Sequence, residues 1–84
     1  MAYSLLVNTA KGSTDNANVT TDAIDTTGAD LIVVAVSAFQ ALPTPTDSKS
    51  NTWTSLVSNA VVDSRIQLWY AQNPTVGSGH TFSV

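Results

Sequence analysis

The stretch that decides the fold is LIVVAVSAF, residues 31–39. It opens with six apolar residues in a row, most of them β-branched, and turn-forming segments flank it at 25–30 (DTTGAD) and 40–51. A short β-branched run of this kind is typical of a strand that is covered on both faces. We therefore predict a central strand here. Both alternate sets of its side chains are apolar, so the pattern does not decide which set faces the core.

Five further strands are predicted on either side of this run. Segment 65–72 (RIQLWYAQ) alternates most clearly, because Ile66, Leu68 and Tyr70 fall on one face of a strand and the residues between them on the other. Gly, Asn, Asp and Pro fill the segments between strands, and these residues favour turns. The predicted strands are 3–10, 19–24, 31–39, 52–58, 65–72 and 80–84.

Strands at spacings of roughly ten residues indicate a sandwich or barrel. We predict an all-β antiparallel sandwich, immunoglobulin-like or jelly-roll-like, with residues 1–84 as one domain. The alternative is a sandwich that is incomplete at the C-terminus, with this chain as the N-terminal part of a larger domain. The predicted core consists of Leu5, Val7, Leu31, Val33, Ala35, Trp53, Leu56, Ile66, Leu68, Tyr70 and Phe82.

The composition favours strands and supplies little chemistry. Ser and Thr make up 22 of the 84 residues, and the chain has one His, no Cys and a net charge of −3. Ser disfavours helix interiors and Thr suits a pleated surface. The three basic residues form no stripe that would bind phosphates, and the longest apolar run is too short to cross a bilayer. We expect no cofactor, no nucleic-acid partner and no membrane partner.

The last residues predict a contact with another chain. An 84-residue domain buries only about 60–65% of its unfolded surface, and without Cys this one has no disulfides to support a thin core. Segment 80–84 ends within a strand pattern and lacks the charge or Pro that protects an edge. We predict that His80, Phe82 and Val84 form an assembly edge. It would pair with chain outside residues 3–79, in a neighbouring subunit or in a continuation of the polypeptide.

Three motifs resemble a β-sandwich module found in bacteriophage structural proteins and in uncharacterised bacterial and metagenomic proteins. The motifs are 25–34 (DTTGADLIVV), 47–54 (DSKSNTWT) and 70–82 (YAQNPTVGSGHTF). The resemblance implies a virion-surface or tail-associated role, such as capsid decoration, and it supplies no catalytic residues.

The polar residues that could form a catalytic or metal site can also be explained by structural roles. His80, the only imidazole, suits a solvent-facing strand end or a subunit contact better than a general base for Ser78 or Ser83. Aspartates 22, 25 and 30 suit turn caps better than a calcium site, because their spacing matches no calcium loop. Asp47 with Asn51 is interpreted as a turn cap in the same way. We expect no enzymatic activity.

The aromatic residues give the alternative function. Trp53 and Trp69 are candidate carbohydrate-binding residues, since flat aromatic faces stack on sugar rings; packing in the core or at an interface is the competing reading. The leading hypothesis is a structural module of a virion, made in the host cytoplasm, whose partners are other virion proteins or identical subunits. The alternative is an extracellular adhesin domain that binds glycans.

Overall fold

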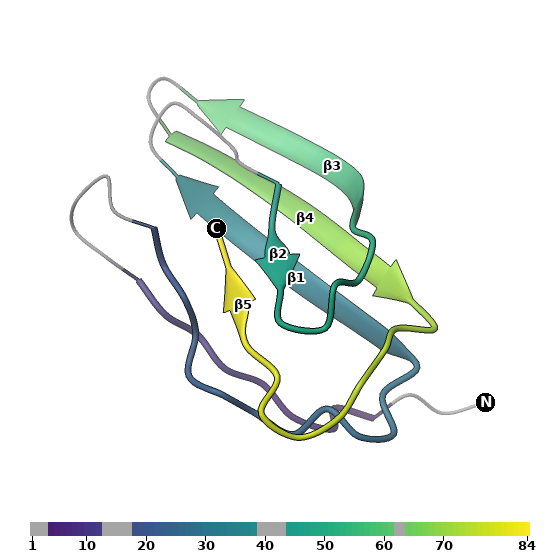
Figure 1. The fold of residues 1–84 in the computed structure, drawn as a ribbon. Coiled ribbons are helices and arrows are strands. Elements are labelled where there is room, and N and C mark those ends of the chain that lie inside the picture. Colours follow the sequence, from purple (N-terminus) through teal and green to yellow (C-terminus); the bar gives the residue numbers. More distant parts are fainter. Residues whose placement is uncertain (1–3, 13–17, 39–43, 62–63) are drawn as a thin grey trace.

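The chain forms two antiparallel β-sheets (Figure 1). The structure, a computed structural model, describes residues 4–12, 18–38, 44–61 and 64–84. No helix occurs in these ranges, and so none is long and apolar enough to cross a membrane. The all-β prediction is confirmed. The strands are β1 (Leu31–Ala38), β2 (Thr46–Asp47), β3 (Thr54–Val61), β4 (Ser64–Gln72) and β5 (Phe82–Ser83).

The larger sheet has the strand order β1-β4-β3, with β4 in the centre. Strand β4 pairs with β1 along its whole length, from Leu31 opposite Gln72 to Ala38 opposite Arg65. It pairs with β3 on its other side, where a bulge between Ser55 and Ser58 shifts the register. The prediction that the apolar run forms a central strand is therefore wrong. Within the described residues β1 lies at the edge of this sheet.

The smaller sheet joins three segments that are far apart in sequence. Strand β5 pairs with β2, and on its other side residues 19–24 meet it through two isolated bridges, Thr20 with Ser83 and Ile24 with His80. Backbone hydrogen bonds of 3.0 Å link Val19 and Val84 in both directions. The prediction that segment 80–84 pairs with chain outside residues 3–79 is therefore wrong. Its backbone groups find partners on both sides within this chain, so the strand offers no open edge.

The predicted first strand is absent as well. Segment 4–12 forms no strand, whereas residues 19–24 form no continuous strand but bond to residues 80–84 through two bridges and further backbone hydrogen bonds. The predicted strand at 52–58 begins two residues later and continues to Val61.

The smaller sheet lies over one face of the larger one, and the core lies between them (Figure 1). This inner face carries Val36 and Ala71, and Phe82 of β5 packs toward it; all three are buried. Three polar residues, Thr26, Gln67 and His80, are buried as well. The core is therefore small and unusually polar for a chain of this size.

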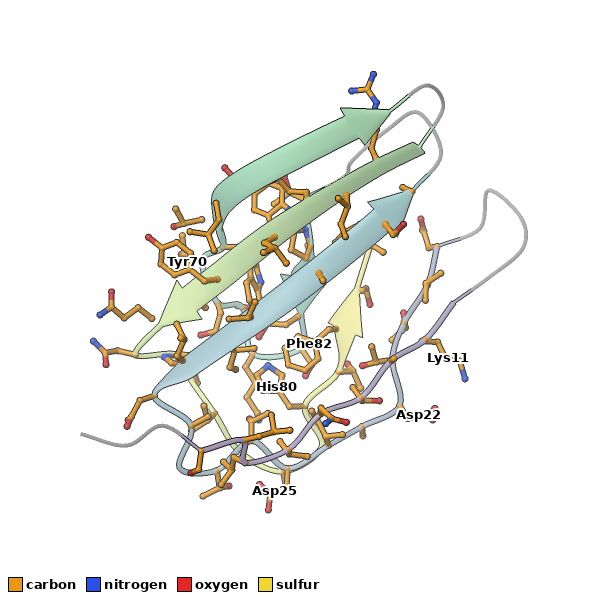
Figure 2. The ribbon with its side chains drawn as sticks, turned by 180° about the vertical axis from the view of Figure 1, so that it is seen from behind. Lys11, Asp22, Asp25, Tyr70, His80 and Phe82 are labelled. Carbon is orange, nitrogen blue, oxygen red and sulfur yellow. The ribbon has the colours of Figure 1, made fainter. Side chains whose placement is uncertain are left out.

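The predicted core falls largely on the opposite face, which we call the outer face. Strand alternation and register place Leu31, Val33, Ala35, Leu56, Ile66, Leu68 and Tyr70 there. Of the eleven residues predicted as core, only Phe82 is buried, and Leu5 of segment 4–12 is 76% exposed. Figure 2 views the sheet from this side, with Tyr70 labelled and His80 and Phe82 beyond the strands. The core was predicted on the wrong face because both faces of the larger sheet are apolar. In addition, a polar residue such as Gln67, which the second sheet covers, is not predicted as core from its hydrophobicity.

Two valines of β1 test this assignment of faces. Val36 is 4% exposed and Val33 is 54% exposed. Val36→Thr buries a hydroxyl that has no designed hydrogen-bond partner in the core. We therefore expect the free energy of unfolding to fall by about 1–3 kcal/mol. Val33→Thr should change it by less than about 0.5 kcal/mol. Urea denaturation followed by circular dichroism measures both, and the reverse order would show that the faces are assigned wrongly.

Candidate functional site

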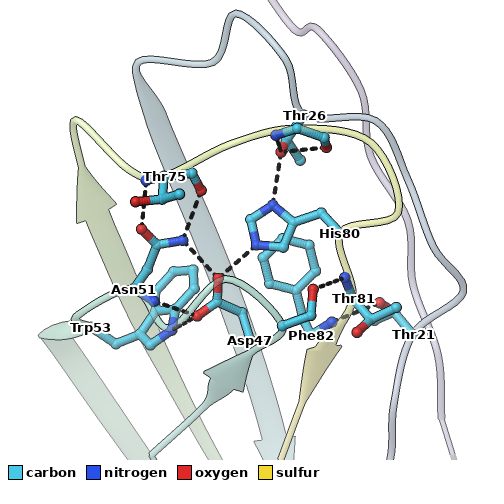
Figure 3. A network of polar contacts seen from close by, with 11 residues as sticks. Thr21, Thr26, Asp47, Asn51, Trp53, Thr75, His80, Thr81 and Phe82 are labelled. Atoms are coloured by element: carbon cyan, nitrogen blue, oxygen red, sulfur yellow. Dashed lines mark hydrogen bonds and ion pairs between the residues drawn. The ribbon is translucent and has the colours of Figure 1, made fainter.

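Asp47 is the centre of a buried polar cluster (Figure 3). It ends β2 and begins a tight turn, in which Ser50 has a left-handed φ of 56° and donates its N–H to the Asp47 carbonyl at 3.2 Å. The carboxylate then accepts the Asn51 backbone N–H at 2.8 Å and the Asn51 side-chain amide at 2.6 Å. The predicted turn cap of Asp47 with Asn51 is confirmed. Asn51 also exchanges two bonds with the backbone of Thr75, which fixes the loop after β4.

His80, two residues before β5, completes the cluster. Its Nε2 lies 2.6 Å from the Asp47 carboxylate, and its Nδ1 lies 2.7 Å from the Thr26 hydroxyl. The ring stacks on Phe82 with centroids 4.4 Å apart and is completely buried. The expectation of a solvent-facing or subunit-contacting histidine is therefore wrong. Sequence reasoning missed this cluster because its members are 33 and 54 residues apart.

The hydrogen bonds around His80 can accommodate either charge state of the ring. An ionised carboxylate only accepts, so Nε2 donates to Asp47. In a neutral ring Nδ1 accepts from the Thr26 hydroxyl. In a charged ring Nδ1 donates to it, and the hydroxyl can turn to the Gly77 carbonyl at 3.3 Å. Thr26 is held for this role by a turn closed by the Ala29 N–H at 3.0 Å, with Gly28 at a φ of 89°, a conformation that favours glycine.

The surroundings of Asp47 lower its pKa. Burial alone raises the pKa of this carboxyl, but hydrogen bonds from His80, Asn51 and Trp53 together outweigh burial and hold the pKa below its ordinary value of 3.8. Asp25 is exposed, and the hydroxyl and backbone N–H of Thr27 lower the pKa of its carboxyl. These two bonds, at 2.6 and 3.0 Å, confirm Asp25 as a turn cap.

The three aspartates considered for calcium do not form a cluster. Asp22 pairs with Lys11 at 3.6 Å on the surface, while Asp30 accepts the backbone N–H of Asn73 through its own carbonyl. Figure 2 shows Asp22 and Asp25 at separate places on the molecule. Within the described residues, no three Asp, Glu, His or Cys side chains come together in a way that could hold a metal ion.

The two tryptophans point toward the layer between the sheets. Trp53 is partly buried, donates its indole N–H to Asp47 at 3.3 Å and packs edge-on against Phe82 at a centroid distance of 6.0 Å. Trp69 faces inward from β4, opposite Val34, and its indole N–H is buried with no partner among the described residues. This geometry favours the packing reading over an exposed platform for sugars.

The line Thr26–His80–Asp47 has the order of a nucleophile, a base and an orienting carboxylate. Catalysis would require a substrate atom within about 3 Å of the Thr26 hydroxyl. That hydroxyl already contacts His80 and Gly77, and Thr26 is only 2% exposed. In this conformation the cluster binds three parts of the chain to one another.

The outer face of the larger sheet is an open apolar surface. Five aliphatic side chains from all three strands are between one third and just over half exposed: Leu31, Val33, Leu56, Ile66 and Leu68. Register places them as neighbours, with Val33 opposite Tyr70 and Ala35 opposite Leu68. A contiguous apolar surface of this kind is a candidate interaction site.

No protein family, curated protein or solved structure matches this chain. Its function must therefore be argued from its own residues.

The Asp47 cluster predicts loss of stability in acid. Because the pKa of Asp47 is lower in the folded than in the unfolded chain, the ionised carboxylate stabilises the fold above about pH 4, and this contribution is lost as the pH falls through the folded-state pKa. Asp47→Asn should lower the free energy of unfolding by about 1.5–3 kcal/mol at pH 7 and flatten its dependence on pH below 4. Urea titrations at several pH values measure this. Asp22→Asn, at the surface and outside the cluster, is the control, and an equally steep acid limb in Asp47→Asn would contradict the assignment.

The tryptophans provide a matched pair. Trp53→Phe leaves Asp47 without one of its donors and should cost about 1–3 kcal/mol. Trp69→Phe removes an unsatisfied buried donor, so we expect a change of less than about 1 kcal/mol. Equal losses in the two variants, measured by thermal and urea denaturation, would show that the Trp69 N–H has a partner.

Proposed function

We propose that this chain is a non-enzymatic structural module that acts through protein–protein contacts. The observation that carries the proposal is the outer face, where aliphatic side chains of β1, β3 and β4 stay exposed while β2 and β5 lie over the opposite face of the same sheet. A monomer rarely leaves an apolar sheet face open. A module that binds a neighbouring protein would bury such a face in the interface.

The finer fold that we propose is a β-sandwich, immunoglobulin-like or jelly-roll-like. Two antiparallel sheets with a core between them support it. Strand β5 lies between β2 and residues 19–24, so the smaller sheet joins segments as far apart in sequence as Thr20 and Ser83. This interleaving is typical of sandwiches with long connections.

The setting that we propose is a phage particle, as a capsid-decorating or tail-associated protein made in the host cytoplasm. The support is that motifs 25–34, 47–54 and 70–82 resemble the β-sandwich module of bacteriophage structural proteins. Each motif contributes a member of the buried cluster, namely Thr26, Asp47 and His80. The motifs thus coincide with the contacts that hold the fold together, which agrees with a structural role. Partners would be other virion proteins or identical subunits.

Particle composition tests this function. Particles banded on a density gradient from a host that carries the gene should contain the chain at a fixed ratio to the major structural proteins, measured by quantitative mass spectrometry. A cytoplasmic host protein of similar abundance is the control for contamination. Recovery of the chain only in the soluble fraction of the lysate would overturn the virion role.

A further inference from the structure

We propose that the outer face is a self-association surface, on which a second copy of the chain packs sheet against sheet about a two-fold axis. This inference deepens the proposed function and rests on it only in requiring that the chain act through protein contacts. Three observations point to a second copy: the area left exposed, the absence of charge on the face and the projection of apolar side chains of three neighbouring strands from the same side of the sheet.

The exposed area exceeds that of a finished monomer. A folded protein of 8.8 kDa exposes about 4,800 Å² by the scaling of surface with mass, whereas this chain exposes 5949 Å². The difference of roughly 1,100–1,200 Å² is summed over the whole chain. Leu5 and Leu6 in segment 4–12 account for part of it, and the open aliphatic side chains of the outer face are apolar area that a second copy would cover.

The charge pattern suits an identical partner. Each chain carries a net charge of −3, yet none of the outer-face positions of β1, β3 and β4 is Asp, Lys, Arg or His. In a two-fold interface each residue near the axis meets its own copy, so any charge there would face a like charge. An uncharged face avoids this repulsion.

The geometry suits a sheet as the occupant. Val33, Leu68 and Leu56 come from three neighbouring strands and project from the same side of the sheet. Two such faces pack about 10 Å apart with their side chains interdigitated. In the dimer, the two outer faces together would form a second, apolar core. The first core, which contains the polar cluster, lies on the other side of each sheet.

Sedimentation velocity from about 1 to about 100 µM tests the proposal. The parent chain should pass from one to two chain masses with rising concentration. Val33→Lys and Leu68→Lys should each raise the dissociation constant about 100-fold, because each buries an unpaired ammonium against its own copy. Leu5→Lys, at a more exposed apolar position outside the sheet, should dimerise like the parent. Circular dichroism checks that every variant is folded.

A cysteine variant keeps the test decisive if the lysine variants fail to fold. The chain has no Cys, so Ala35→Cys places a single thiol on the outer face, and Ser4→Cys places one outside it. Maleimide labelling of Ala35→Cys should slow at least tenfold between dilute and concentrated protein, while Ser4→Cys labels equally fast at both. A parent chain that stays monomeric at about 100 µM, or a dimer in which Ala35→Cys stays reactive, would overturn the proposal. Either result leaves the particle-composition test untouched, so the two proposals can fail separately.

Discussion

The contact between Asp47 and His80 is the interaction on which the rest of the structure depends. It is short, 2.6 Å, and both side chains are completely buried. Through Asp47 it organises the turn to Asn51 and the indole of Trp53, and through His80 it reaches Thr26 and the loop at Gly77. A buried charged group is tolerated only where hydrogen bonds replace the lost water. Here four donors surround one carboxylate, and the small sheet is built around them.

This cluster stabilises the fold in the way that apolar packing does in a larger chain. The buried apolar residues of the described chain are few, and Phe82 alone among them is large. Its ring contacts both His80 and Trp53, so the aromatic and polar parts of the core share members. Such a core specifies one arrangement of the segments, since each donor must meet a particular acceptor. It does so while Leu31, Ile66 and Leu68 lie on the other face of the larger sheet.

Sequence reasoning recovers the local part of this fold and misses the distant part. Alternation and turn residues were enough to predict strands near Leu31–Ala38 and Ser64–Gln72, and to predict Asp47 and Asn51 as a turn cap. The inward face was predicted wrongly because apolar periodicity ranks Ile66 and Leu68 above Gln67, although Gln67 is the buried residue. Nothing in the periodicity reports that a second sheet supplies polar partners. For the same reason the sequence did not predict the contacts of His80 with Asp47 and Thr26. The only indication in the sequence is that these three residues lie in motifs rich in turn residues.

The position of β5 between two earlier segments constrains the order in which the protein can fold. Residues 19–24 and β2 share no direct pairing and are joined only through residues 80–84, which are synthesised after both. A growing chain therefore holds two flanking segments with unsatisfied backbone groups until the intervening strand arrives. Closing such long loops is slow compared with forming the hairpin of β3 and β4. The three-stranded sheet can thus form first, with both of its faces uncovered, and the newly made chain depends on its surroundings during that interval.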